Sequence, residues 1–236
     1  MPAIYMNYRN TCTYITDDHE YDNNIIRLTE RIYFSNTFRM AYRDIYPKWG
    51  QVLDARFTSA PWDKDIYGIQ KYIRGTLFLP GFAKNHSLII KGGYETQSDF
   101  DNVILLYSNK LSYARGYNEN IVSERLTSFS ADYTLPLFYP DFAAASILYL
   151  KRIRGSLFMD GSRGWETYHP DTKITTHGAT DFVSFGGELL ADFFVLRFPF
   201  EISGGASFGY IPSKSKVFAV PTISVNIYGT TLGRKH

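Results

Sequence analysis

The side chains that most often perform enzymatic chemistry show no catalytic spacing in this chain. Neither a Gly-x-Ser-x-Gly nucleophile elbow nor a phosphate-binding loop occurs, and we interpret the glycine-rich run at residues 203–209 as strand glycines facing a crowded interior. No His-Glu-x-x-His spacing is found among the histidines, which are His19, His86, His169, His177 and His236. We therefore predict no catalytic residues, no metal site and no cofactor, and we expect that the protein is not an enzyme.

One charged tripeptide stands apart, because the segment that contains it matches no regular pattern. Arg115, Gly116 and Tyr117 lie within residues 98–120, a stretch of about 23 residues without sustained strand alternation. A loop of that length inside a compact domain is usually functional or disordered. The tripeptide is too short to be a motif alone, so its meaning depends on the elements around it.

Composition favours pleated strands over helices. Aromatic residues make up 17% of the 236 residues, with 19 Tyr and 18 Phe, while charged residues make up 20%. Aromatic side chains pack well on pleated sheets. The net charge of +2 indicates no nucleic-acid partner. The single cysteine, Cys12, excludes an internal disulfide and a cysteine-based zinc cluster.

Alternation of apolar and polar residues is the strongest pattern in the chain. In residues 26–42 one parity carries Ile26, Leu28, Ile32, Phe34 and further apolar residues, whereas the other parity is polar and largely basic. Because successive strand residues point to opposite faces, this predicts a strand of about 17 residues with one apolar face. Strands of globular proteins mostly have about 5 or 6 residues, and a bilayer-crossing strand needs about 9 to 11.

The same alternation recurs along the whole chain and predicts nine or ten long strands. We expect residues 161–180 to form an exposed polar loop and the other connections to alternate between short and long. Besides residues 26–42, the expected strands are residues 3–9, 51–58, 71–79, 86–95, 123–137, 142–160, 181–196, 200–211 and 217–228.

Two classes of all-β protein show such alternation, and the polar face distinguishes them. A soluble sandwich or lipocalin-like barrel points its polar face to water and usually carries many Lys and Glu there, whereas here that face is rich in Ser, Gly and Thr. Aromatic residues also gather at the strand ends, as in the interface girdles of membrane barrels. The pattern favours an antiparallel transmembrane β-barrel, or part of one.

With strands on both sides of the Arg-Gly-Tyr segment, the chain resembles the C-terminal barrel of the BamA/TamA-type outer-membrane proteins, the bacterial surface antigen superfamily. In that family a long loop with an Arg-Gly-Phe/Tyr tip folds back into the barrel lumen, and five strands follow it. Five strands are also expected here after Arg115, Gly116 and Tyr117. The resemblance covers about residues 25–229.

The resemblance also implies a partner for the loop arginine. The family carries a Phe-x-Asp-x-Gly-like signature on the second strand after the loop, whose Asp points into the lumen. This chain has Phe158, Asp160 and Gly161 at that place, with a departure in the glycine spacing. Phe158 and Asp160 share the polar parity of their strand. We therefore expect an Arg115–Asp160 pair that latches the loop, because a guanidinium and a carboxylate form a strong, oriented pair.

Further charged residues fall on the predicted lumenal face. We expect them to pair with one another, the acids with Arg152 and Arg154, or to line a pore. The acidic members are Asp132, Glu188, Asp192 and Glu201.

The resemblance implies a barrel of the bacterial outer membrane that assists the insertion or translocation of proteins or lipids. Its expected partners are outer-membrane lipids and unfolded outer-membrane or secreted proteins, together with missing N-terminal domains or a second half barrel. Two alternatives remain open: a passive pore or ligand-binding barrel, and a membrane anchor for an enzymatic or binding domain. We divide the chain into an N-terminal strand and loop (residues 1–24), the barrel (residues 25–229, with the lumenal loop at 98–122) and a basic tail (residues 230–236).

Overall fold

The fold is all-β, as the alternation predicts. The computed structural model describes residues 2–9, 25–38, 40–41, 43–62, 68–98, 106–117, 121–144, 147–169, 174–196, 200–227 and 230–233. Its strands are β1 (Pro2–Arg9), β2 (Ile25–Thr37), β3 (Gly50–Ser59), β4 (Gln70–Pro80), β5 (Ser87–Gln97), β6 (Val122–Phe138), β7 (Phe142–Ala144), β8 (Leu148–His169), β9 (Ile174–Val195), β10 (Glu201–Ile211), β11 (Lys216–Ile227) and β12 (Thr230–Gly233). A 3-10 turn, η2 (Pro212–Lys214), joins β10 to β11.

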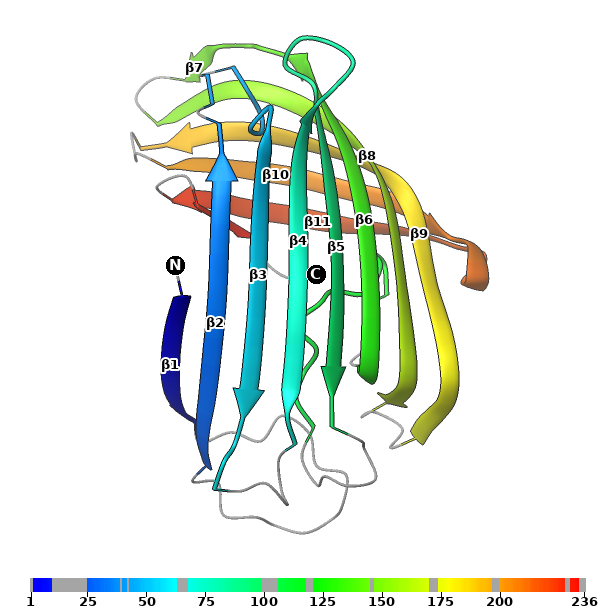
Figure 1. Ribbon diagram of the computed structural model, residues 1–236. Coiled ribbons are helices and arrows are strands. Elements are labelled where there is room, and N and C mark those ends of the chain that lie inside the picture. The colour runs from blue at the N-terminus through cyan, green and yellow to red at the C-terminus, as the bar shows by residue number, and fades with distance from the viewer. Residues whose placement is uncertain are drawn as a thin grey trace.

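The strands form one antiparallel sheet in chain order. It runs from β1 to β12, with only the short β7 off the main path and paired to β8. The sheet curls strongly: β2 to β6 run side by side along one wall, and β8 and β9 bend over to meet β10 and β11 (Figure 1). Within the described residues no pairing joins β1 to β12, so the sheet is curved but not closed.

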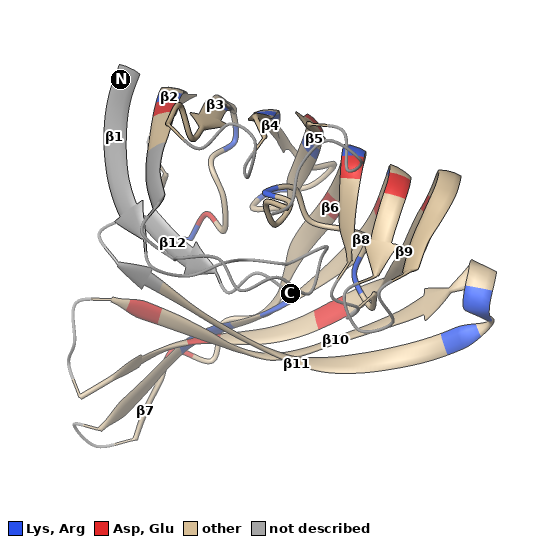
Figure 2. Ribbon diagram, turned by 90° about the horizontal axis from the view of Figure 1, so that it is seen from below, with Lys and Arg blue, Asp and Glu red and all other residues tan. Residues whose placement is uncertain are grey.

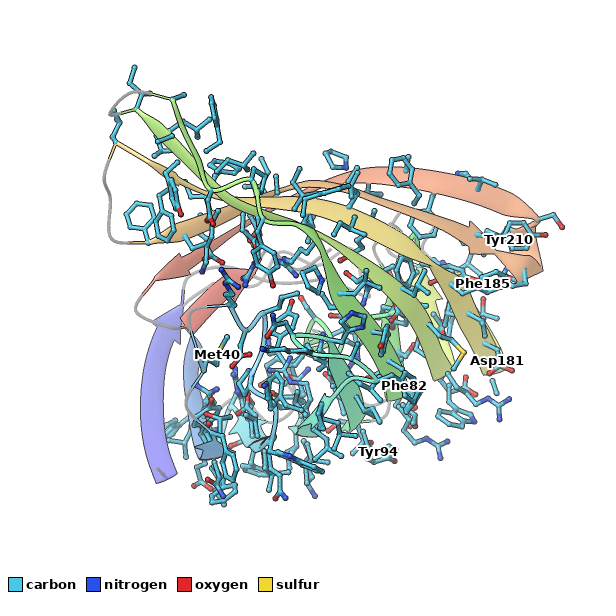
Figure 3. The ribbon with its side chains drawn as sticks, turned by 90° about the horizontal axis from the view of Figure 1, so that it is seen from above. Met40, Phe82, Tyr94, Asp181, Phe185 and Tyr210 are labelled. Carbon is cyan, nitrogen blue, oxygen red and sulfur yellow. The ribbon has the colours of Figure 1, made fainter. Side chains whose placement is uncertain are left out.

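The two faces of the curled sheet have opposite chemistry. Large apolar side chains on the outer face are exposed, including Ile32 at 61% and Leu157 at 64%. They form rows across the strands: Met159 pairs with Phe185, and Phe185 with Tyr210. Tyr94, Phe185 and Tyr210 lie at the outer margin of the sheet (Figure 3).

The buried side chains of the strands, in contrast, lie mostly on the inner face, and polar ones outnumber apolar ones among them. Asp54, Glu95 and Asp192 are each at most 1% exposed. Viewed from below, the sheet curls around an interior that is crossed by connecting segments (Figure 2). The fold is therefore apolar outside and polar inside, which reverses the arrangement of a water-soluble sheet.

Several predicted boundaries are wrong. Residues 161–169 and 174–180 belong to β8 and β9 rather than to a polar loop, because paired strands of 22 residues each extend past the apolar part of the sheet. The first long strand, β2, ends at Thr37 after 13 residues instead of about 17. Residues 230–233, expected to belong to a tail, form β12 on the edge of β11. The expected strand at residues 142–160 is divided into β7 and β8.

No helix among the described residues is long and apolar enough to cross a membrane.

Candidate functional site

Residues 106–117 form the longest described part of the long connection between β5 and β6. This segment, which we call the inner loop, has no strand or helix and packs against the inner face of the sheet. Leu106, Tyr107, Leu111, Ala114 and Tyr117 are all less than 9% exposed. The inner loop is thus packed into the interior of the curled sheet.

The base of the inner loop is held by one carboxylate. Glu95 on β5 is fully buried and accepts hydrogen bonds from the backbone N–H groups of Lys110 (2.7 Å) and Leu111 (2.8 Å). It also accepts one from Gln70 Nε2 at 2.7 Å. Buried backbone donors need acceptors, and a carboxylate offers several at once. Sequence patterns did not single out Glu95, although its inward parity on β5 was a usable signal.

A second set of hydrogen bonds joins the inner loop to the start of β6. Asn109 Nδ2 donates to the backbone oxygen of Ser123 (3.0 Å), and Asn109 Oδ1 accepts from the Ser123 N–H (2.8 Å). The Tyr113 hydroxyl lies 2.8 Å from Ser123 Oγ. Gly93 on β5 gives Leu111 room, since a Cβ there would lie 2.6 Å from Leu111 Cδ2. The loop and the wall therefore fit closely.

Arg115 lies at the tip of the inner loop and contacts three carboxylates on three different strands. Its Nε is 2.9 Å from Asp160 Oδ2 on β8, and its Nη1 is 3.0 Å from Glu188 Oε1 on β9. Its Nη2 also donates to Asp132 Oδ1 on β6. The Arg115 backbone N–H donates to Asp160 Oδ2 at 3.3 Å. The Arg115–Asp160 contact expected from the sequence is present, with two further acids beside it.

The environment keeps Arg115 charged. Burial alone lowers the pKa of the guanidinium, but the charges of Asp132, Asp160 and Glu188 outweigh it and hold the pKa above its ordinary value. The guanidinium also lies over the Phe158 ring, 4.1 Å from its centroid, a cation–π contact. Phe158 thus contributes to the site from the same face as Asp160.

Gly116 and Tyr117 complete the tip. Gly116 has φ +89°, and a Cβ there would lie 2.5 Å from the Phe218 ring on β11, so both the backbone and the space require glycine. Tyr117 packs edge-on against Phe182 of β9 at 5.1 Å, and its hydroxyl is 2.7 Å from Ser213 Oγ in η2. The tip therefore contacts β9, β11 and the η2 turn in addition to the carboxylates on β6, β8 and β9.

Gly161 is the one residue of the expected latch that does not contact the inner loop. It has the outer-face parity of β8, between Phe129 and Val183, and nothing lies within 4 Å of where its Cβ would be. Its place next to Asp160 in the sequence puts it on the opposite side of the sheet.

The other predicted lumenal charges form a separate buried network at the opposite end of β8. Arg152 Nε bonds Asp192 Oδ2, Arg152 Nη2 lies 3.1 Å from Glu201 Oε1, and Arg154 Nε lies 3.1 Å from Asp192 Oδ1. Arg152 and Arg154 also reach the connection between β2 and β3, through the Asp44 carbonyl (2.9 Å) and the Tyr46 hydroxyl (3.1 Å). Asp132 and Glu188 are not in this network and contact Arg115 instead.

No group of three or more His, Cys, Asp or Glu side chains among the described residues is arranged to hold a metal ion. The acids around Arg115 are occupied by its guanidinium. The described contacts hold the inner loop against the inner face of the sheet at several strands at once.

No family model, curated protein or solved structure matches this chain.

Proposed function

We propose that this chain is a β-barrel domain, or part of one, of the bacterial outer membrane. The observation that carries the proposal is the reversed polarity of the sheet. A soluble monomer rarely exposes a contiguous apolar patch larger than a few hundred Å². Here a row of outward residues runs across six strands through Leu77, Ile90, Ala131, Met159, Phe185 and Tyr210.

The lengths of the strands support the same proposal. β3, β4, β5 and β10 have 10 to 11 residues, which suits a bilayer-crossing strand of about 9 to 11 residues. In an outer membrane the exposed apolar face would contact lipid. The polar inner face would contact the inner loop and water.

We further propose that the domain assists the insertion or translocation of proteins or lipids, like the surface antigen family that its sequence resembles. The contacts of the Arg-Gly-Tyr tip with Asp132, Asp160 and Glu188 support this proposal, because they anchor a loop inside the curled sheet as the resemblance implies. The edge strands β1 and β12, each paired on one side in the described residues, are available for pairing with another chain.

Assisted folding in vesicles tests the function. The protein is reconstituted into vesicles, an unfolded outer-membrane barrel is added, and its folding is followed by its heat-sensitive migration in gels. Faster folding than in empty vesicles is expected, with the acceleration lost in Arg115→Ala and kept in Arg163→Ala, whose side chain forms an exposed pair with Asp181. Rates equal to those of empty vesicles, together with a steady open conductance in planar bilayers, would instead indicate a passive pore.

A further inference from the structure

A hollow lies among the exposed apolar side chains of the outer face. It has a volume of about 610 Å³ and lies over β2 to β5, the strands that run side by side along one wall (Figure 1). Most of the residues that line it have the outer parity of their strands, so it opens away from the inner loop. Sites for small ligands have volumes of about 300–1,000 Å³. This hollow, which we call the outer groove, therefore has the size of a ligand site.

The outer groove exists because small residues lie between large ones. Ala55 on β3 is flanked in its row by Ile32 on β2 and Ile73 on β4, which are 61% and 45% exposed. In the adjoining row Gly75 and Gly92 lie opposite each other, and a Cβ at either position would have only a backbone oxygen within 4 Å. The sides of the groove are therefore apolar side chains, and the path that leads on from it is open backbone. Such a shape suits a narrow apolar chain.

The end of the outer groove nearest the connection between β3 and β4 carries two charges. Lys71 and Glu30 lie in one row there, with Phe57 between them, and Lys71 Nζ is 6.0 Å from the centroid of the Phe57 ring. Both charged side chains are exposed, and neither forms an ion pair with a described residue. Thr96, opposite Lys71 on β5, adds a hydroxyl group. This end therefore offers one cation and one anion that are not paired with each other.

We propose that the outer groove binds one phosphatidylethanolamine molecule, with an acyl chain along Ala55 and the headgroup at Lys71 and Glu30. Lys71 and Thr96 donate to the phosphate, and Glu30 accepts from the ammonium group. Two unpaired charges of opposite sign match a zwitterionic headgroup, whereas Glu30 would repel a headgroup with net negative charge. This inference rests on the proposed contact of the outer face with lipid and adds a specific lipid site to it.

Lipid titration followed by native mass spectrometry tests the headgroup contacts. The full chain in detergent is titrated with phosphatidylethanolamine and, separately, with phosphatidylglycerol. We expect one tightly retained phosphatidylethanolamine, bound more strongly than phosphatidylglycerol. Lys71→Gln should weaken its binding about tenfold or more, because a charge-assisted contact is lost. Lys84→Gln removes an exposed charge from the turn between β4 and β5 and should leave the affinity unchanged.

Filling the outer groove tests the contact with the acyl chain. Ala55→Leu places a larger side chain between Ile32 and Ile73, and we expect the tightly bound lipid to be lost. Ala131→Leu makes the same change on the outer face of β6, away from the groove, and binding should persist. Both changes keep the outer face apolar, and heat-sensitive migration in gels checks that each variant is folded. Glu30→Gln should reduce the preference for phosphatidylethanolamine over phosphatidylglycerol.

Equal affinity of the wild-type chain for the two lipids would overturn the proposal, as would equal weakening by Ala55→Leu and Ala131→Leu. Absence of a tightly bound lipid would also overturn it. Spin labels at positions 157 and 159 on β8, outside the groove, report separately whether the outer face contacts lipid. Frequent collisions of those labels with oxygen, without a tightly bound lipid, would reject the groove alone. Frequent collisions with a water-soluble nickel chelate would reject the lipid contact of the outer face as well.

Discussion

Arg115 is the shared counter-ion of three acids on the inner face. Removing one partner of a buried ion pair typically costs about 3–5 kcal/mol, since the remaining charge stays buried and unpaired. Arg115→Ala leaves Asp132, Asp160 and Glu188 facing one another, and we expect a loss of unfolding free energy in that range. Equilibrium unfolding in detergent or lipid measures it.

The control for Arg115→Ala is Arg163→Ala, which breaks an ion pair whose side chains are 53% and 55% exposed. Exposed pairs contribute little, so the stability of this variant should stay close to wild type. Equal losses in the two variants would mean that the three acids are not held by Arg115.

Gly116 allows the effects of backbone and space to be separated. Gly116 and Gly178 both have positive φ, +89° and +90°, but a Cβ meets the Phe218 ring only at Gly116. Gly178→Ala should therefore cost about 1–2 kcal/mol for the left-handed backbone alone. Gly116→Ala should cost more, and Phe218→Ala in the same chain should recover part of the difference. Similar losses at the two glycines would show that the tip is not packed against β11.

At the scale of single residues, the sequence predicted the Arg115–Asp160 contact correctly but did not predict the other contacts of the inner loop. The Arg115–Asp160 pair followed from a family resemblance and from the parity of Asp160 on its strand. Asp132 and Glu188 were placed on the inner face by the same parity. Parity alone does not say which strand a loop tip reaches, so their pairing with Arg115 could not be derived. The role of Glu95 was missed because the loop donors that it binds are the backbone N–H groups of Lys110 and Leu111, which carry no sequence signal.

At the scale of elements, the inner loop is held at its base by β5. Glu95→Gln replaces one oxygen by an NH₂ group that cannot accept from the N–H groups of Lys110 and Leu111. Leaving a buried donor unsatisfied costs about 1–3 kcal/mol, so we expect the loop to open more often. Limited proteolysis should then cut within residues 106–117 faster than in wild type. Glu30→Gln, at an exposed position on β2, is the matched control, and equal cleavage in all three proteins would contradict this role.

The strands themselves show how far alternation predicts structure. Alternation located β3, β4, β5 and β10 to within about one or two residues, because most of their inner residues are polar and most of their outer residues are apolar. It failed for the distal parts of β8 and β9, where polar residues lie on both faces. Those parts are held by backbone pairing between two long neighbouring strands, which does not require an apolar face.

At the scale of the whole molecule, we propose that the outer face of the sheet contacts lipid. The row that contains Met159 and Phe185 has no covering layer in the described residues, and side chains of the opposite parity, such as Phe158 and Asp160, are buried. Accessibility along β8 should therefore alternate with a period of two residues. A soluble sheet of the same strands would expose its polar parity to water instead.

Spin-label accessibility along β8 in vesicles tests whether the outer face contacts lipid. In a Cys12→Ser chain, single cysteines replace Ser156, Leu157, Phe158 and Met159 in turn, and each label is exposed to oxygen, which concentrates in lipid, and to a water-soluble nickel chelate. We predict high oxygen and low chelate collision rates at positions 157 and 159. At positions 156 and 158 we predict either higher chelate than oxygen collision rates or low collision rates for both probes. High chelate collision rates at 157 and 159 would show that the outer face meets water and not lipid.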